Sequence, residues 1–378
     1  MVALLLKKQI LTLIFIFLFS FSVYSADKPS LSAYSAVLIN AETKEIIYEK
    51  NAHTKRSMAS TTKIMTSILA IESGRLSEIV TAENVNAEGS SIGLKNGYKL
   101  TLEALIYGMM LESGNDAAEL TAEFLGGSEE EFAVFMNGKA SEIGMNNTNF
   151  VTSSGLDSGE HYSTAYDMAL LGAYAIQNPI FREICSTKTK RVDFIEPDIS
   201  VTFSNHNKLL SLCDGVFGIK TGFTKKSGRC LVSSCERDGR VLVAVTLNAG
   251  DDWNDHKKLY DYGFDVCSLN EVYIRLPESV RVYGGNLQSV SVALKENPIR
   301  LGYTDNIGKI TQKVYLPAFI YAPIESEDIV GRVDLLCGDA VLASYDIYSG
   351  EGIEVVEPTP EKKSLFVRIK DKINEILN

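Results

Sequence analysis

The hydrophobic pattern of this chain changes twice, and the order of the changes restricts the folds it can adopt. Between residues 33 and 48, two apolar stretches flank a polar segment and predict a β-hairpin. From Thr61 into the middle of the chain the apolar residues recur at helical spacing, and after Asp214 short β-rich runs alternate with turns. Strands on either side of a helical middle predict one sheet assembled from both ends of the domain and packed against helices, an α+β arrangement.

The predicted helix boundaries place two polar segments at helix ends. Residues 61–72 carry an isoleucine stripe, so Ser60 is expected at a helix N-terminus. A second helix is predicted over residues 102–111 and a third from about Asp116. Residues 113–115 are therefore expected on a short, constrained loop between two helices.

The chain beyond residue 266 has a different character. We predict a first domain over residues 26–266 and a separate, strand-rich β domain over 267–356, with runs divided by Gly-Gly, Asn-Pro and Gly-Asp turns. Residues 357–378 follow as a Pro-containing linker and a helix with an apolar face opposite a basic one. Such a helix binds a membrane surface, docks on its own protein or frays in solvent, and we expect the membrane surface.

The N-terminus indicates export. Residues 1–25 carry Lys7 and Lys8, an apolar run over 10–21 and a compact residue at Ser25. This pattern is typical of a secretory signal peptide, with cleavage predicted after Ser25. An uncleaved anchor is the alternative, although the apolar run is short for a bilayer span. Either way, we expect the remaining chain at the outer face of the cytoplasmic membrane, in the periplasm or in the cell-wall space.

Charge and composition exclude some partners. The chain has 37 basic and 48 acidic residues, and its net charge of −11 becomes more negative once Lys7 and Lys8 are removed. Such a surface argues against nucleic acid as a partner. With 45% hydrophobic residues and no low-complexity tract, the chain is long enough for a globular protein of two domains.

The cysteines and histidines indicate neither a metal site nor a cofactor. The six cysteines lack the CxxC pairs of a zinc site, and Cys230 and Cys235 are expected on opposite faces of one strand. We expect buried, unpaired cysteines, with an isolated disulfide elsewhere as the alternative in an oxidising compartment. Three histidines have no partner spacing for metal and are predicted to be surface or packing residues: His53, His206 and His256.

A serine hydroxyl is a poor nucleophile until a base removes its proton, so a serine enzyme must supply one. The segment Gly89-Ser90-Ser91-Ile92-Gly93 matches the GxSxG pattern of a nucleophile elbow. That elbow needs a buried strand before it and a helix after it, whereas polar residues flank this segment on both sides. We therefore do not expect Ser91 to be a nucleophile.

The tetrad Ser60-Thr61-Thr62-Lys63 offers a serine with a lysine base. Residues at i and i+3 of a helix lie on one face, within contact of each other. The helix dipole also favours negative charge developing near Ser60. For Lys63 to act as a base near neutral pH its pKa must fall, which requires burial or a second cation.

Lys220-Thr221-Gly222 can supply that second cation from a strand edge. Lys220 and Thr221 would bind a carboxylate, and the missing side chain at Gly222 would let a substrate backbone approach the strand. Ser113 and Asn115 would add a hydroxyl that relays protons and an amide that holds a peptide bond. Each motif is weak alone, since SxxK recurs at 25–28 and SxN at 268–270, but their joint order is specific.

With these motifs, the chain resembles a D-alanyl-D-alanine carboxypeptidase of the low-molecular-mass penicillin-binding proteins. The resemblance covers nearly everything after the predicted signal peptide, including the β domain and the tail. Its specific segments are Met58 to Thr66, Gly108 to Ala118, Gly155-Leu156-Asp157 with His161 to Thr164, and Gly218 to Thr224.

The resemblance implies a penicillin-binding or β-lactamase-like domain, with helices on both sides of an antiparallel sheet, followed by a small all-β domain and an amphipathic helix. It implies that Ser60 attacks the penultimate D-alanine of a peptidoglycan stem peptide ending in D-Ala-D-Ala and that water hydrolyses the acyl-enzyme, without a cofactor or metal. β-Lactam antibiotics such as penicillin would acylate the same serine and inhibit the enzyme.

The resemblance also assigns roles. Lys63 would accept the proton, Ser113 would pass it to the leaving amine, and Asn115 would orient the peptide. Lys220 and Thr221, with Gly222 beside them, would bind the carboxylate. The backbone N–H groups of Ser60 and Phe223 would form the oxyanion hole.

Two positions depart from the family pattern. Met58 stands where proline is common, and Phe223 stands where histidine often follows KTG. Both bear on rate or pH dependence more than on reaction type. His161 lies in a segment typical of the family near the rim of the site, and we expect it to be structural.

Two other functions fit parts of the pattern. A class A β-lactamase shares the SxxK and KTG motifs, but usually has SDN where Gly114 replaces the aspartate, and it carries no extra β domain. Rapid turnover of nitrocefin would favour it. A non-catalytic wall-binding protein of the same fold would be marked by a broken motif, and none of the three is broken.

Overall fold

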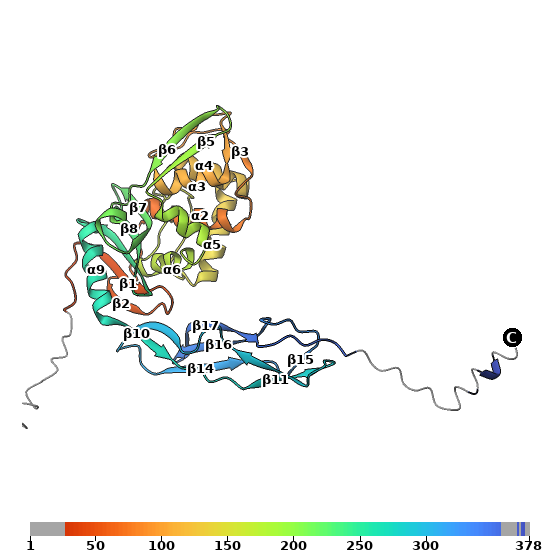
Figure 1. The fold of residues 1–378 in the computed structure, drawn as a ribbon. Helices are drawn as coiled ribbons and strands as arrows, with labels where there is room; N and C mark the ends of the chain where they lie inside the picture. Colours follow the sequence, from red (N-terminus) through yellow and green to blue (C-terminus); the bar gives the residue numbers. More distant parts are fainter. Residues whose placement is uncertain (1–26, 357–368, 370–371, 375–378) are drawn as a thin grey trace, which may run out of the picture. The chain divides into compact units, whose positions relative to one another are not determined.

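The computed structural model describes residues 27–356, 369 and 372–374 (Figure 1). The predicted signal peptide over residues 1–25 lies outside the described residues. So does most of the predicted linker and amphipathic helix of residues 357–378. Within the described ranges, no helix is long and apolar enough to cross a membrane.

The first of two compact units runs to Leu269 and includes Gly302–Asn306. Its centre is a five-stranded antiparallel sheet in the order β2-β1-β9-β8-β7. The strands are β1 (Ser35–Asn40), β2 (Ile46–Lys50), β7 (Val216–Thr224), β8 (Gly228–Arg237) and β9 (Arg240–Ala249). Ser35 of the early hairpin lies opposite Leu247 of β9. The predicted sheet, assembled from both ends of the domain, is therefore confirmed.

Helices cover both faces of this sheet, as predicted. They are α2 (Lys63–Glu72), α3 (Leu102–Leu111), α4 (Asn115–Gly126), α5 (Glu129–Ile143), α6 (Ala165–Ala175), α7 (Pro179–Ser186), α8 (Leu209–Leu212) and α9 (Asp252–Val266). Gly172 lets α6 approach Val232 so closely that an added Cβ would lie 3.1 Å from it. At Gly263 of α9 an added Cβ would lie 2.9 Å from Leu242, whose side chain belongs to a second apolar cluster.

The two apolar clusters also separate the cysteines of β8. Cys230 packs into the large cluster under α2 to α7, whereas Cys235 packs into the smaller cluster beneath α9. The predicted placement on opposite faces of the strand is thus confirmed. All six cysteines are present as free thiols.

Helix ends set the position of the central loop. The Thr101 side chain accepts a hydrogen bond from the Ala104 N–H and caps α3, which spans the predicted 102–111. Asn115 is already the first residue of α4, so the loop between the helices is one residue shorter than predicted. Ser113 on that loop has φ 63°, a left-handed conformation that non-glycine residues rarely adopt.

Two short antiparallel hairpins complete the first unit. One pairs β3 (Ile79–Thr81) with β4 (Lys99–Thr101), and the other pairs β5 (Thr189–Phe194) with β6 (Ile199–Ser204). The segment after β6 leads to His206.

The second unit comprises Asn270–Leu301 and the described residues from Ile307 onward. Its six-stranded sheet has the order β14-β16-β17-β12-β11-β15. The strands are β11 (Ser279–Tyr283), β12 (Ser289–Ala293), β14 (Ile310–Tyr315), β15 (Phe319–Tyr321), β16 (Ile329–Cys337) and β17 (Ala340–Ser349). Strands β10 (Cys267–Val272) and β13 (Ile299–Thr304) each contain residues of both units. The predicted all-β character of this region is confirmed.

Candidate active site

Ser60 lies in a 3₁₀ turn, Ala59–Thr62, that runs directly into α2. The predicted helix N-terminus is therefore present, with its first turn wound more tightly than an α-helix. Ala59 has φ 48°, a strained conformation that places Ser60 at the surface of a cleft. The Nζ atom of Lys63, one turn further on, lies 3.1 Å from Ser60 Oγ.

Lys63 is fully buried and held on three sides. Besides Ser60, its Nζ donates hydrogen bonds of 2.6 Å to Asn115 Oδ1 and 2.6 Å to the Ser154 carbonyl. Burial first, and the charge of Lys220 second, lower the pKa of Lys63 well below its usual value. Three carboxylates oppose that shift: Glu119, Asp116 and Glu129. The charged form of this lysine is thus disfavoured where its Nζ contacts Ser60 Oγ.

The contact with Ser154 was not predicted from the sequence. It depends on Gly155, whose φ is 84° and whose added Cβ would clash with the Ala59 carbonyl. Only glycine lets this loop approach the Ser60 turn so closely. The segment beginning at Gly155 is one of those that carry the family resemblance, so the sequence did indicate that this loop matters. No neighbouring residue indicated which backbone atom of the loop would contact Lys63.

Lys220 of β7 is the second cation, and it is 1% exposed. Its Nζ donates to Ser113 Oγ at 3.2 Å and to the Thr221 carbonyl at 3.1 Å. Burial lowers the pKa of Lys220 to about 7. The structure therefore brings all three predicted motifs together around two buried lysines.

Gly222 has a second use besides the one expected. An added Cβ there would lie 3.0 Å from the Ser60 nitrogen and 3.1 Å from the Thr61 nitrogen. The missing side chain lets β7 pass against the protein's own Ser60 turn. The glycine therefore serves this close approach, in addition to the access expected for a substrate backbone.

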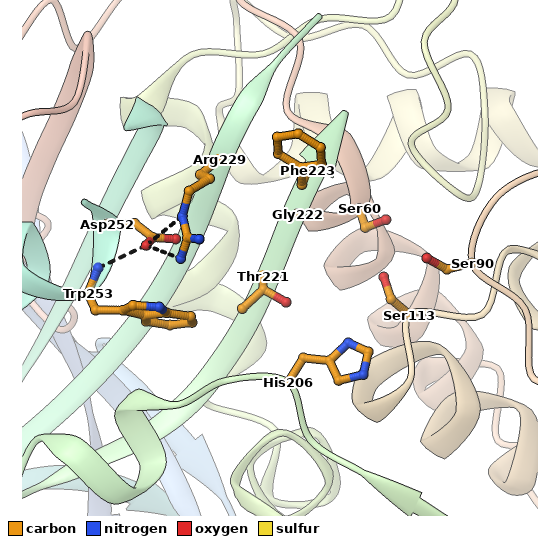
Figure 2. A pocket seen from close by; sticks show the side chains of 10 residues that line it. All are labelled: Ser60, Ser90, Ser113, His206, Thr221, Gly222, Phe223, Arg229, Asp252 and Trp253. Atoms are coloured by element: carbon orange, nitrogen blue, oxygen red, sulfur yellow. Dashed lines mark hydrogen bonds and ion pairs between the residues drawn. The ribbon is translucent and has the colours of Figure 1, made fainter. Parts of the chain in front are cut away.

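These residues surround a cleft of about 490 Å³ (Figure 2). It is lined by Ser60, Ser90, Ser113, His206, Thr221, Gly222, Phe223, Arg229, Asp252 and Trp253. Figure 2 shows Ser60, Ser113 and Ser90 converging on one side of the cleft, with Thr221 and Gly222 of β7 opposite. Lys63, Asn115 and Lys220 lie buried behind this lining.

The GxSxG segment supports the site without providing a nucleophile. Ser91 Oγ donates to Asp116 Oδ2 at 2.5 Å, and the same carboxylate accepts from the Ile92 and Leu94 N–H groups. Asp116 therefore pins this loop to the start of α4. Ser90 is thereby held at the rim of the cleft, where its carbonyl accepts from the Asn115 N–H at 2.7 Å.

Arg229 adds a positive charge that sequence reasoning missed. It lies opposite Phe223 across the β7–β8 pair, and its Nε donates to Asp252 Oδ1 at 2.9 Å. The Arg229 side chain is 42% exposed, whereas that of Asp252 is only 4% exposed. The guanidinium is thus fixed by a buried carboxylate, while part of it remains open to the cleft beside Trp253 (Figure 2).

Two histidines lie near the site, one exposed and one buried. His206 was predicted to be a surface or packing residue; it is exposed but lines the cleft, with its Nε2 3.4 Å from Glu112 Oε2. His161 is buried, and burial lowers its pKa to about 4. Its Nε2 lies 2.9 Å from Thr62 Oγ1 and its Nδ1 accepts from the Val151 N–H, which fits the structural role expected for it.

No cluster of His, Cys, Asp and Glu among residues 27–356, 369 and 372–374 has the arrangement of a metal site. An antiparallel sheet flanked by helices, with a serine and two buried lysines meeting beside one strand, defines a serine-type hydrolase of the penicillin-binding class.

The family can be stated more closely. The family model for D-alanyl-D-alanine carboxypeptidases matches residues 22–251, and that for the C-terminal domain of penicillin-binding protein 5 matches residues 257–355. The chain belongs to the family of serine-type D-alanyl-D-alanine carboxypeptidases.

Individual relatives agree with this assignment. The D-alanyl-D-alanine carboxypeptidase DacF of Bacillus subtilis is 30% identical over 85% of this chain and 86% of its own length. DacC of Escherichia coli is 32% identical over 90% of each chain. Among solved structures, penicillin-binding protein 5 of Haemophilus influenzae has a TM-score of 0.63 at 25% identity, covering 87% of this chain and 99% of its own. The predicted fold and enzyme class are confirmed.

Proposed function

We propose that this enzyme removes the terminal D-alanine from peptidoglycan stem pentapeptides through an acyl-enzyme on Ser60. The observation that carries the proposal is the 3.1 Å contact between Ser60 Oγ and Lys63 Nζ in a buried site that disfavours the charged lysine. A neutral Lys63 takes the hydroxyl proton as Ser60 Oγ bonds to the carbonyl carbon of the penultimate D-alanine.

The next step expels the terminal D-alanine. Ser113 Oγ, hydrogen-bonded to Lys220, passes the proton taken up by Lys63 to the leaving nitrogen as the peptide bond breaks, so Lys63 is neutral again and Lys220 keeps its charge. Water then attacks the ester carbonyl, Lys63 accepts a proton from that water, and Lys63 returns this proton to Ser60 Oγ as the ester bond breaks. No step requires a cofactor or a metal ion.

Charge in the cleft favours a substrate with a free carboxylate. Lys220 and Thr221 bind the terminal carboxylate, and the approach of that anion raises the pKa of Lys220 and keeps it protonated. The partly exposed guanidinium of Arg229, although ion-paired with Asp252, offers further N–H donors to a carboxylate in the same cleft. Together these groups favour a peptide that ends at the D-alanine over a peptide that continues beyond it and so lacks a carboxylate there.

Two further groups orient the peptide. The side-chain oxygen of Asn115 accepts a hydrogen bond from Lys63, and one side-chain N–H donates to the Glu88 carbonyl. The second side-chain N–H is assigned to the substrate amide. The missing side chain at Gly89, where an added Cβ would lie 3.0 Å from Asn115 Nδ2, keeps that amide accessible. The backbone N–H groups of Ser60 and Phe223 form the oxyanion hole, so the exposed Phe223 ring takes no part in it.

Penicillin is proposed to acylate the same serine, because its strained amide and its carboxylate present the groups that the cleft binds in a D-Ala-D-Ala peptide. The acyl-enzyme formed would deacylate slowly. The β-lactam would then inhibit the enzyme by occupying Ser60.

We further propose that the enzyme is exported and acts at the outer face of the membrane. The pattern of residues 1–25 supports export, and the basic amphipathic pattern of 357–378 supports attachment to an anionic membrane surface. The mature full-length protein should sediment with anionic vesicles, and a chain truncated after Glu357 should stay in the supernatant while remaining active. Failure of the full-length protein to sediment would contradict the attachment.

Release of D-alanine tests the activity directly. The purified enzyme, given a pentapeptide ending in D-Ala-D-Ala, should release one D-alanine, and Ser60→Ala should release none. Ser77→Ala is the matched control, since Ser77 is exposed and does not line the cleft. Equal release by the wild type and Ser60→Ala would refute the proposal.

A further inference from the structure

Two of the six free thiols lie at one end of the β7–β8 pair. Cys213 follows α8 and packs against the apolar cluster that contains Cys235 of β8, and each thiol shifts the pKa of the other. The remaining four thiols have oxygen or amide partners in the protein: Cys185, Cys230, Cys267 and Cys337. All six thiols are free, as the sequence led us to expect, and Cys213 and Cys235 differ from these four in lying at the same end of the β7–β8 pair.

The backbone fixes this pairing. Val216, three residues after Cys213, lies opposite Cys235 in the β7–β8 ladder. The Gly215 carbonyl accepts from the Glu236 N–H at 2.9 Å, and Cys235 Sγ lies 3.5 Å from the Asp214 carbonyl.

Glycine at position 215 is required for this turn. Its φ is 81°, and an added Cβ would clash with the Glu236 carbonyl and lie 3.2 Å from Cys235 Sγ. The left-handed turn leads into Val216, which pairs with Cys235, and so keeps Cys213 at this end of β8. The strand pairing thus brings the two cysteines to the same apolar cluster.

Arg237 helps to give the two thiols different pKa values. Its Nη2 donates to Cys213 Sγ at 3.6 Å, and the guanidinium is itself held by Asp261 and lies over the Phe264 ring. The hydrogen bond from Cys235 and the charge of Arg237 lower the pKa of Cys213 to about 7, despite partial burial. Hydrogen bonding and burial raise the pKa of Cys235. Cys213 is partly exposed and Cys235 is fully buried, so Cys213 is the thiol that meets a reagent first.

We propose that Cys213 and Cys235 are a redox site that closes to a disulfide by exchange with a disulfide oxidant, either a small dialkyl disulfide or an exported thiol–disulfide oxidoreductase. The Cys213 thiolate attacks one sulfur of the oxidant, which breaks the oxidant's S–S bond and releases one thiolate. Cys235 then loses its proton and attacks Cys213 Sγ, which expels the second thiolate. The two cysteines lose two electrons and two protons, and the oxidant gains them as two thiols.

The bridge would join the start of β7 to β8 on the face of the sheet beneath α9. The register of the β7–β8 pair shifts between Val216 and Gly218, so this end of β7 is the irregular part of the strand that carries Lys220. A covalent link there would hold the irregular end in place. It would leave the cleft itself untouched, because neither cysteine lines it.

Mapping of disulfides in the full mature protein tests the proposal. The protein is equilibrated with oxidised and reduced glutathione, its remaining thiols are alkylated, and it is digested with trypsin. Oxidation should link the peptides 209–220 and 230–237, lighter by about 2 Da than the two free thiol peptides together. The linkage should persist in Cys230→Ala and vanish in Cys235→Ala, which distinguishes the two cysteines of the second peptide.

Cys213→Ser provides a second variant, because its partly exposed position should tolerate the change, and circular dichroism reports whether each variant is folded. The oxidised wild type should also unfold at a higher temperature than the reduced protein, by roughly 7–14 °C for a loop of this length in a domain of this size. Complete alkylation of both cysteines under oxidising glutathione, or a linkage that survives Cys235→Ala, would overturn the proposal. Neither outcome depends on whether the enzyme releases D-alanine.

Discussion

Replacing Lys220 with methionine should make the first unit more stable while removing its activity. Lys220 is 1% exposed, and burial lowers its pKa from 10.5 to about 7. Between these two values the unfolded chain binds a proton that the folded protein does not, so burial of this lysine opposes folding, and the stability of the wild type rises with pH across the window. Methionine fills a similar volume without a charge.

The size of the effect follows from that pKa. Below pH 7 the difference between 10.5 and about 7 corresponds to about 5 kcal/mol at 1.4 kcal/mol per pH unit, and at pH 9 about 2 kcal/mol of it remains. The variant also loses the hydrogen bonds from Nζ to Ser113 Oγ and to the Thr221 carbonyl, worth about 1 kcal/mol each. Lys220→Met should therefore gain about 3 kcal/mol at pH 6 and almost nothing at pH 9.

Thermal unfolding followed by circular dichroism measures this difference. At 2–4 °C per kcal/mol, the midpoint of the variant should lie roughly 6–12 °C above that of the wild type at pH 6 and close to it at pH 9. Lys257→Met, on the exposed surface of α9, is the matched control and should change neither midpoint. A Lys220→Met midpoint below that of the wild type at pH 6, or a gain equal at both pH values, would refute the reasoning.

Three further substitutions test the geometry of the cleft. Gly155→Ala should lower the calorimetric unfolding midpoint by several degrees, because its Cβ would clash with the Ala59 carbonyl; an unchanged midpoint would contradict the close approach of the two loops. Gly222→Ala should unfold at nearly the wild-type temperature but lose roughly 100-fold in kcat/KM for D-alanine release, since its Cβ would displace the Ser60 turn. Arg229→Gln should raise KM for the pentapeptide with little change in kcat, and an unchanged KM would exclude Arg229 from substrate binding.

The parts of this site that the sequence predicts are those with a local signal. Ser60 and Lys63 are one helical turn apart, so their contact follows from spacing alone. The glycine-bounded break after residue 111 placed Ser113 on a constrained loop, and the change to β-rich runs placed Lys220 on a strand. Each of these inferences needed only a few neighbouring residues.

The remaining residues come together through tertiary contacts that have no local signal in the sequence. Ser154 reaches Lys63 with a backbone carbonyl, and any residue type has one. Arg229 enters the cleft because β7 and β8 pair in a particular register, and Asp252 meets it only because α9 starts at the end of β9. The contact between Cys213 and Cys235 likewise depends on the left-handed turn at Gly215, whose conformation the sequence alone does not specify.

The central claim is that Ser60 carries the acyl group, and mass spectrometry of the enzyme incubated with penicillin tests it most directly. The tryptic peptide of residues 57–63 should gain the mass of one penicillin, with fragment ions placing it on Ser60, and Ser60→Ala should gain none. Lys63→Met should form the same adduct far more slowly, because the base that takes the Ser60 proton is gone. An adduct on another residue, or one retained in Ser60→Ala, would contradict the account.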